Sequence, residues 1–122
     1  MSTENAALEL DELTIRVSHE GDASQIVWTG VSEIQDPEST LGPFLRGLIP
    51  KLVNRKVVID FRKLEYLNSA TMQPLFQVLK ELNAKQIQTT LLYDPEVEWQ
   101  RLGFRSIQAV TKTLTYIAIA KG

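Results

Sequence analysis

Two hydroxyl side chains, Ser69 and Thr71, stand between a predicted buried strand and a predicted helix. The strand is indicated by the nearly continuous apolar run at 57–61, and the helix by the apolar spacing at 72–82. A hydroxyl at a helix N-terminus lies beside unpaired backbone N–H groups and the positive end of the macrodipole, where a phosphate group is stabilised. The position therefore suits phosphate chemistry on a serine, although the spacing alone favours a structural role. The alternative is that Ser69 only caps the helix.

The other chemically capable residues lack partners at useful spacing. Asp60 lies near the end of the apolar run, and we expect it to end the strand and to bond the residues after it. His19 is the only histidine and there is no cysteine, so neither a Ser-His-Asp triad nor a His/Cys metal site is indicated. Gly-x-Gly-x-x-Gly, Walker and Gly-x-Ser-x-Gly motifs are also absent. The sequence predicts a protein that is not an enzyme and uses no metal or cofactor.

Charge and composition exclude several partner classes. The chain has 122 residues, 43% of them hydrophobic, and a formal net charge of -2. A mildly acidic chain without a basic run is a poor nucleic-acid binder, because most such affinity comes from neutralising phosphates. No apolar run reaches the ~18–20 residues of a membrane span, and residues 1–6 do not resemble a signal peptide. We expect a cytoplasmic protein that binds neither nucleic acid nor membrane.

The first part of the chain predicts a tail followed by a hairpin. Residues 1–9 are small and polar, which favours a flexible N-terminal tail, and residues 10–122 form a single predicted domain. Leu13, Ile15 and Val17 alternate with polar residues, as in a half-buried strand. A turn at 21–22 and a second strand at 25–30 complete the hairpin.

The rest of the chain predicts alternating helices and strands. A helix at 41–52 is expected to begin at Ser39 or Thr40 and to kink or stop at Pro50, and Ala70 or Thr71 is expected to cap the second helix. Further elements are a strand at 88–93, a short helix from Asp94 to the region of 103, and a strand at 114–119. The order predicts an α/β fold with a mixed sheet of about five strands and helices mainly on one face.

The segment 57–82 resembles the STAS domain, whose best-known single-domain members are anti-sigma-factor antagonists. Val58-Ile59-Asp60-Phe61 is similar to the family's strand, and Leu67-Asn68-Ser69-Ala70-Thr71 to its phosphorylation loop. Leu102-Gly103-Phe104 resembles the family's apolar-Gly-apolar element. The sequence departs from the family at three positions: Asn68, Ala70 and Thr71 stand where the family usually has Asp, a second hydroxyl residue and Gly.

The resemblance implies a non-catalytic regulatory module whose partner binding is switched by reversible phosphorylation of Ser69, with Thr71 as the alternative site. The implied partner-binding residues are Asn68, Ser69, Ala70, Thr71 and Gln73. In the antagonists, the partners are a serine kinase that is often the anti-sigma factor itself, and a PP2C-type phosphatase. The Leu-Asn-Ser loop also resembles a second STAS-like group, whose unphosphorylated members bind and activate a diguanylate cyclase.

Two other functions remain open at this stage. The chain could be a docking domain that works without phosphorylation, or a module that binds a small ligand or nucleotide. A homodimer formed through the exposed edge of a terminal strand is open as well.

Overall fold

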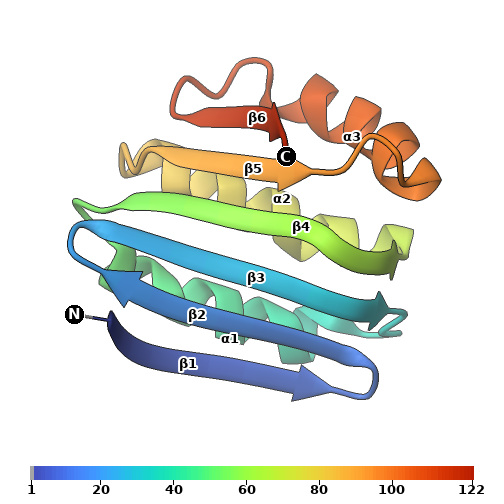
Figure 1. The fold of residues 1–122 in the computed structure, drawn as a ribbon, viewed down its shortest axis with the longest axis horizontal. Helices are drawn as coiled ribbons and strands as arrows, with labels where there is room; N and C mark the ends of the chain where they lie inside the picture. Colours follow the sequence, from blue (N-terminus) through green and yellow to red (C-terminus); the bar gives the residue numbers. More distant parts are fainter. Residues whose placement is uncertain (1) are drawn as a thin grey trace.

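A six-stranded sheet, with its strands in sequence order from β1 to β6, forms the centre of the molecule (Figure 1). The computed structural model describes residues 2–122, and the side chains of residues 6–122. The strands are β1 (Ser2–Leu10), β2 (Leu13–Glu20), β3 (Ala23–Ser32), β4 (Lys56–Leu67), β5 (Thr89–Tyr93) and β6 (Ile117–Lys121); the helices are α1 (Pro37–Leu52), α2 (Ser69–Ala84) and α3 (Glu98–Thr111). β1, β2 and β3 pair antiparallel and β3 to β6 pair parallel, which confirms the predicted α/β class and mixed sheet.

Strand β1 occupies the place of the flexible tail predicted for residues 1–9, and residue 1 lies outside the described residues. β1 pairs antiparallel with β2 along nearly its whole length. Leu8 and Leu10 are half-buried whereas Ala7 and Glu9 are exposed, so the strand alternates as an edge strand does. Its small and polar residues weaken this alternation in the sequence. The sheet consequently has six strands rather than about five.

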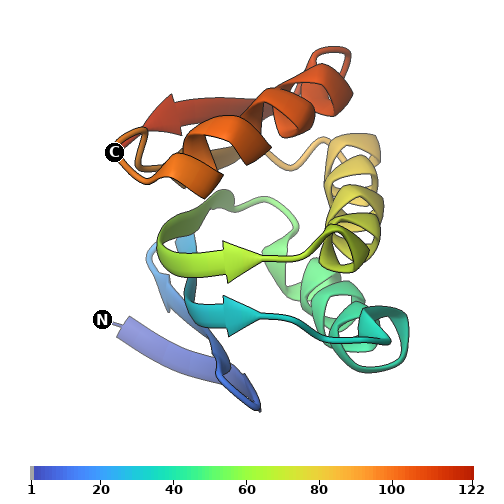
Figure 2. The ribbon, with the colours of Figure 1, turned by 90° about the vertical axis from the view of Figure 1, so that its right-hand side faces the viewer.

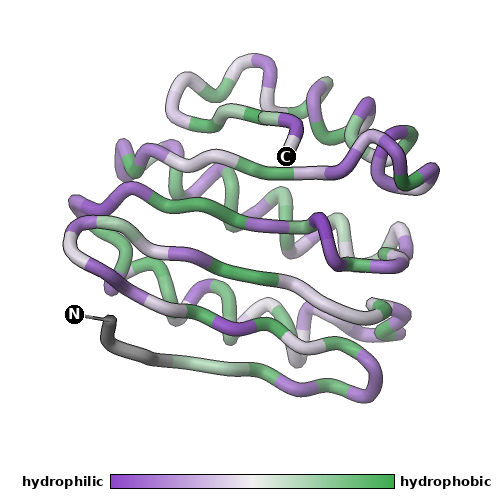
Figure 3. Tube along the Cα trace, viewed as in Figure 1, coloured by the Kyte–Doolittle hydropathy of each residue, from purple (hydrophilic) through white to green (hydrophobic). Residues whose placement is uncertain are grey.

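The core lies between the sheet and helices α1 and α2, which lie side by side on one face (Figure 2). The hairpin of β2 and β3 forms around the turn at Gly21 and Asp22, as predicted. Its inward-facing residues Leu13 and Ile15 are fully buried, and so is Leu79 of α2. Along β2, hydrophobic and hydrophilic positions alternate, as the colours of Figure 3 show. The intervening positions of β2 are polar, so the face of this strand that points away from the two helices carries polar side chains.

Helix α1 begins earlier than predicted and does not stop at Pro50. It starts at Pro37, two residues before the earlier of the two expected caps, and it continues through Pro50 to Leu52. Pro50 lies only two residues from the helix end, so the loss of its N–H affects one bond of the last turn. Leu52 is buried and draws this last turn onto the core.

Helix α3 also differs from its prediction at both ends. Asp94 does not cap it: the Asp94 carbonyl accepts from Val97 N–H at 3.1 Å and its Oδ1 accepts from Glu96 N–H at 2.9 Å, which forms a turn before the helix begins at Glu98. The helix does not end near Gly103 but continues to Thr111, because buried Phe104 and Ile107 extend its apolar face. None of the helices in the described part of the chain is long and apolar enough to cross a membrane.

Candidate functional site

Strand β4, which leads to the predicted phosphorylation loop, is longer than predicted. The sequence predicted a strand at 57–61 and then a polar bridge, but β4 continues to Leu67. Its pairing with β3 shifts register between Val27 and Thr29 and again between Gly30 and Val31, so the strand is irregular where the bridge was expected. The end of β4 therefore lies beside the end of β3, where Ser32 is paired with Leu67.

Asn68 is the residue that caps α2. Its Oδ1 accepts from the backbone N–H of Thr71 at 3.0 Å, so the prediction of a cap at Ala70 or Thr71 is wrong. The same side chain donates through Nδ2 to the carbonyl of Ile34 at 3.2 Å, and the Asn68 N–H donates to the carbonyl of Ser32 at 2.9 Å. An aspartate could accept the capping bond but could not donate to Ile34. The amide therefore ties the start of α2 to the β3–α1 connection, which explains why Asn suits this position.

Ser69 is the first residue of α2 and is exposed to solvent. No hydrogen bond joins its hydroxyl, or the N–H groups of Ser69 and Ala70, to another group among the described residues. The first turn of α2 contains no acidic residue. A phosphate on Ser69 would therefore meet free donors and an uncompensated positive helix end.

Thr71, the alternative phosphorylation site, has no exposed surface. Its Oγ1 lies 2.8 Å from the hydroxyl of Ser32, which is also fully buried, and donates to Oδ1 of Asn68. A kinase could reach this hydroxyl only after the first turn of α2 had opened. The sequence already ranked Ser69 before Thr71, and the burial of the Thr71 hydroxyl adds a physical reason for that order.

Exposed apolar side chains are found on the elements that flank the start of α2. Ala70 and Gln73, two predicted partner-binding residues, are exposed, and Tyr66 before the loop is 44% exposed. Leu102 of α3 is 47% exposed, and a side chain at its neighbour Gly103 would lie 3.9 Å from Cε of Met72 on α2. The sequence analysis did not identify Tyr66 or Leu102 as surface residues. An aromatic residue in an otherwise polar segment was the available signal for Tyr66.

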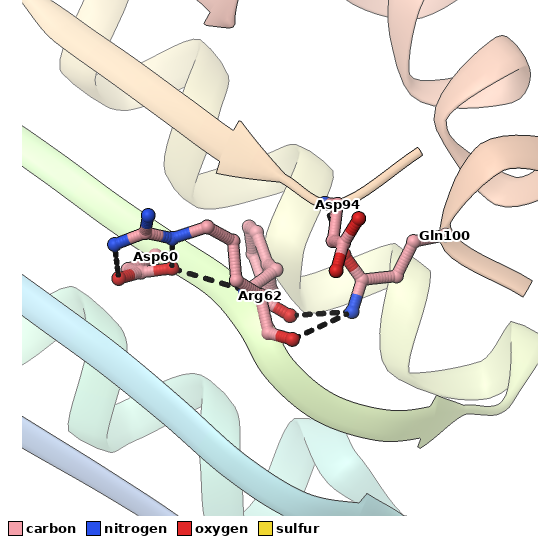
Figure 4. Close-up of polar contacts among 5 residues, drawn as sticks. Asp60, Arg62, Asp94 and Gln100 are labelled. Carbon is pink, nitrogen blue, oxygen red and sulfur yellow. Dashed lines mark hydrogen bonds and ion pairs between the residues drawn. The ribbon is translucent and has the colours of Figure 1, made fainter. Parts of the chain in front are cut away.

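Gln100 of α3 bonds to the irregular part of β4, and Figure 4 shows two of its bonds to carbonyls of that strand. This fully buried side chain donates through Nε2 to the carbonyls of Phe61 at 2.8 Å and Leu64 at 3.0 Å, and its Oε1 accepts from Asp94 N–H at 2.7 Å. Trp99 Nε1 donates to the same Leu64 carbonyl at 2.8 Å. These bonds satisfy backbone groups that an irregular strand leaves unpaired. No sequence pattern pointed to Gln100.

Asp60 forms an ion pair with Arg62 on the same strand, as Figure 4 shows. Its Oδ2 accepts from the guanidinium at 2.8 Å, and its Oδ1 accepts from both Nε and the backbone N–H of Arg62 at 3.0 Å. The side-chain hydrogen bond with Arg62 lowers the pKa of Asp60, against the opposing effect of burial. The expected bond to the following residues is confirmed, but Asp60 does not end the strand. Its contacts are those of a structural residue.

The only histidine in the sequence, His19 on β2, pairs with Ser24 near the start of β3. Ser32 lies at the other end of that strand. His19 Nδ1 is 2.6 Å from the hydroxyl of Ser24, which also accepts from Nε of Arg55 at 2.6 Å. Arg55 in addition donates to the carbonyls of Gly21 and Ala23, so this cluster joins the hairpin turn to the end of α1. Among the side chains that the structure describes, those of residues 6–122, no three His, Cys, Asp or Glu are placed to hold a metal ion.

Comparison with known proteins shows similarity in fold. No family model and no curated protein matches the sequence. Among solved structures, the chain is similar to SiaC in the complex of the diguanylate cyclase SiaD with its activator SiaC from Pseudomonas aeruginosa: the TM-score is 0.66 and the identity 15%, over 97% of this chain and 100% of the other. It is also similar to an anti-sigma factor antagonist from Mycobacterium paratuberculosis, with a TM-score of 0.65 and 14% identity over 91% of this chain and 90% of the other. The STAS-like fold is thereby confirmed.

Proposed function

We propose that this protein is a non-catalytic, cytoplasmic regulator that acts as one STAS-like domain, with β1 as part of its sheet. It binds a protein partner over Ser69, and phosphorylation of Ser69 prevents that binding. The observation that carries the proposal is the contrast at the start of α2: Ser69 is exposed and makes no side-chain hydrogen bond among the described residues, while Asn68 and Thr71 are fixed on either side of it. A kinase can reach this hydroxyl without disturbing the fold.

The proposed switch rests on where the added charge can be tolerated. A phosphate adds about −1.5 to −2 charge and strong acceptor oxygens. At the start of α2 this charge faces backbone donors, with no acidic residue in the first turn to repel it. A partner packed over Ser69 would have to bury a hydrated dianion next to Ala70, which is costly. Phosphorylation should therefore release the partner and leave the domain folded.

The elements around the start of α2 expose apolar side chains that suit a protein-binding site. Tyr66 and Leu102 expose a large part of their apolar side chains, and aromatic residues are enriched in interfaces. Asn68, Ala70 and Gln73 would contact the partner at the start of α2. Thr71 supports this surface from beneath, because its side chain is buried against Ser32.

Two partner classes fit this mechanism. The similarity to SiaC, which activates the diguanylate cyclase SiaD, supports a cyclase whose activation ends when Ser69 is phosphorylated. The similarity to an anti-sigma factor antagonist supports a serine kinase that is also the anti-sigma factor, together with a PP2C-type phosphatase. In both classes the binding event is controlled by the same hydroxyl.

The experiment that tests the proposal is phosphosite mapping by mass spectrometry on protein purified from its native host with phosphatases inhibited. Phosphate on Ser69 is the expected result. Phosphate on Thr71 would contradict our assignment of the residue, and unmodified peptides under all growth conditions would contradict the switch.

A further inference from the structure

A second surface, remote in sequence from Ser69, lies at the C-terminal edge of the sheet. β6 pairs only with β5, so one side of its backbone is not covered by another described strand (Figure 1). A shallow groove runs between β6 and the second half of α3; we call it the β6 groove, lined by Arg105, Gln108, Lys112, Leu114, Ile117 and Ile119. Nothing in the proposed switch uses these residues.

The backbone of β6 offers hydrogen-bonding groups toward the groove side. Tyr116 and Gly122 bond to β5: the Tyr116 carbonyl accepts from Thr89 N–H and the Gly122 N–H donates to the Tyr93 carbonyl, each at 2.9 Å. In a parallel pair, alternate residues bond to one neighbour and the residues between them point the other way. The N–H and C=O groups of Ile119 and Lys121 therefore point to the outer edge of the sheet. An exposed edge of this kind is a template for one more strand.

The charge of this region is the opposite of that of the whole chain. Residues 99–122 contain the basic residues Arg101, Arg105, Lys112 and Lys121 and no acidic residue, whereas the whole chain carries a net charge of -2. Arg105 and Lys112 line the groove directly. The floor is apolar, since Leu114 and Ile119 are half-buried and pack against the core. The groove thus combines free backbone groups, an apolar floor and a basic rim.

We propose that the β6 groove binds an extended, acidic segment of a partner protein, which adds a strand to the sheet next to β6. Its main chain pairs with Ile119 and Lys121, its apolar side chains cover Leu114 and Ile119, and its carboxylates face Arg105 and Lys112. A second copy of this chain is a poorer occupant through the same edge, because β6 against β6 would bring two sets of these basic residues together.

The test uses a short fluorescein-labelled peptide of alternating Glu and Val, with a peptide of alternating Lys and Val as its control, and measures anisotropy on the full chain. We expect the acidic peptide to bind at least about tenfold more tightly than the basic one, and salt to weaken its binding. Equal binding of the two peptides, or no binding of the acidic one, would overturn the proposal. Concentration-dependent self-association through β6 would overturn it as well.

Two pairs of variants locate the binding. Arg105→Glu with Lys112→Glu should lower the affinity about tenfold or more, while Arg101→Glu with Lys51→Glu, an equal charge change at exposed positions outside the groove, should leave most of it. Lys121→Pro removes an N–H that points outward and should weaken binding more than Lys121→Gln, which removes only the charge. Binding that survives both the paired reversal and Lys121→Pro would place the peptide elsewhere and overturn the proposal. If Lys121→Pro does not fold, the comparison of the groove pair, Arg105→Glu with Lys112→Glu, with the control pair outside the groove still decides the test.

Discussion

The hydroxyl of Thr71 lies 2.8 Å from the hydroxyl of Ser32, and both side chains are fully buried. This contact joins the first turn of α2 to the end of β3, two segments that are 39 residues apart in the sequence. Together with the bonds of Asn68 to the β3–α1 connection, it fixes the backbone on both sides of Ser69. The exposed hydroxyl is therefore presented by a rigid support.

The Ser32–Thr71 contact should be visible in a double-mutant cycle. Thr71→Val leaves the Ser32 hydroxyl buried without a partner, so it should lower the free energy of unfolding by about 1–3 kcal/mol. The double variant Ser32→Ala with Thr71→Val should cost less than the sum of the single changes. Urea unfolding measures all three, with Thr113→Val at an exposed position as the control. Strictly additive costs would show that the two hydroxyl groups do not interact.

The position of the helix cap predicts which loop residue supports stability. Asn68→Ala removes the cap of α2 and should cost ~0.5–2 kcal/mol in the free energy of unfolding. Ser69→Ala changes an exposed side chain without hydrogen bonds to the described residues, so its effect should stay within about 0.5 kcal/mol. Chemical denaturation of the two variants compares them directly. If Ser69→Ala lowered the free energy of unfolding more than Asn68→Ala does, Ser69 and not Asn68 would be the cap.

Partner binding should respond to charge at Ser69. Ser69→Asp should weaken binding to the cognate kinase or cyclase, because the carboxylate would be buried beneath the partner. Ser69→Ala should bind whether or not the kinase is active. Thr113→Asp carries the same charge change at an exposed position on another part of the chain and should bind as the wild type does. Calorimetry with each candidate partner gives the comparison, and undiminished binding by Ser69→Asp would contradict the switch.

The lowered pKa of Asp60 predicts a loss of stability of the folded protein in acid. Its pKa is lower in the folded protein, mainly through its side-chain hydrogen bond with Arg62, so its contribution to stability is present above the pKa of the unfolded chain. That contribution is lost as the pH falls through the lower, folded-state pKa. Asp60→Asn should therefore unfold with a smaller change in Tm between neutral pH and pH values below about 4. An equally steep acid-side decline in the variant would assign the effect to other carboxyl groups.

Periodic apolar patterns made most of the fold predictable. The alternation in β2 and the helical spacing of α2 placed Leu13, Ile15 and Leu79 correctly in the core. Strand β1 was missed because its small residues carry a weak pattern, and its stability depends on pairing with β2. The ends of α1 and α3 differ from the prediction because of tertiary packing. Buried residues continue each helix past a Pro or Gly at which the local sequence favours an end.

The candidate site was predictable only in part. Ser69 and its loop stood out in the sequence because a hydroxyl precedes a helix. The difference between Ser69 and Thr71 depends on Ser32, which local spacing could not bring to the site. The role of Gln100 could not be predicted for the same reason. Its side chain donates to the backbone carbonyls of Phe61 and Leu64, which belong to another element of the fold.

Gln100 should control the local stability of the chain that leads to Ser69. Gln100→Leu keeps a side chain of similar size but leaves the carbonyl of Phe61 and the N–H of Asp94 without this partner. The loss should lower the free energy of unfolding by at least about 1–3 kcal/mol, because these groups are left unsatisfied in the interior.

Hydrogen exchange distinguishes this role from a general loss of stability. In Gln100→Leu, amide exchange should accelerate most at residues 61–68 and 94–98, and much less in the hairpin of β2 and β3. Gln108→Leu, an exposed position on the same helix, is the matched control and should exchange as the wild type does. Uniform acceleration over the whole chain would mean that Gln100 stabilises the core without positioning β4. Faster exchange confined to 61–68 and 94–98 would mean that α3 stabilises the part of β4 that leads to Ser69.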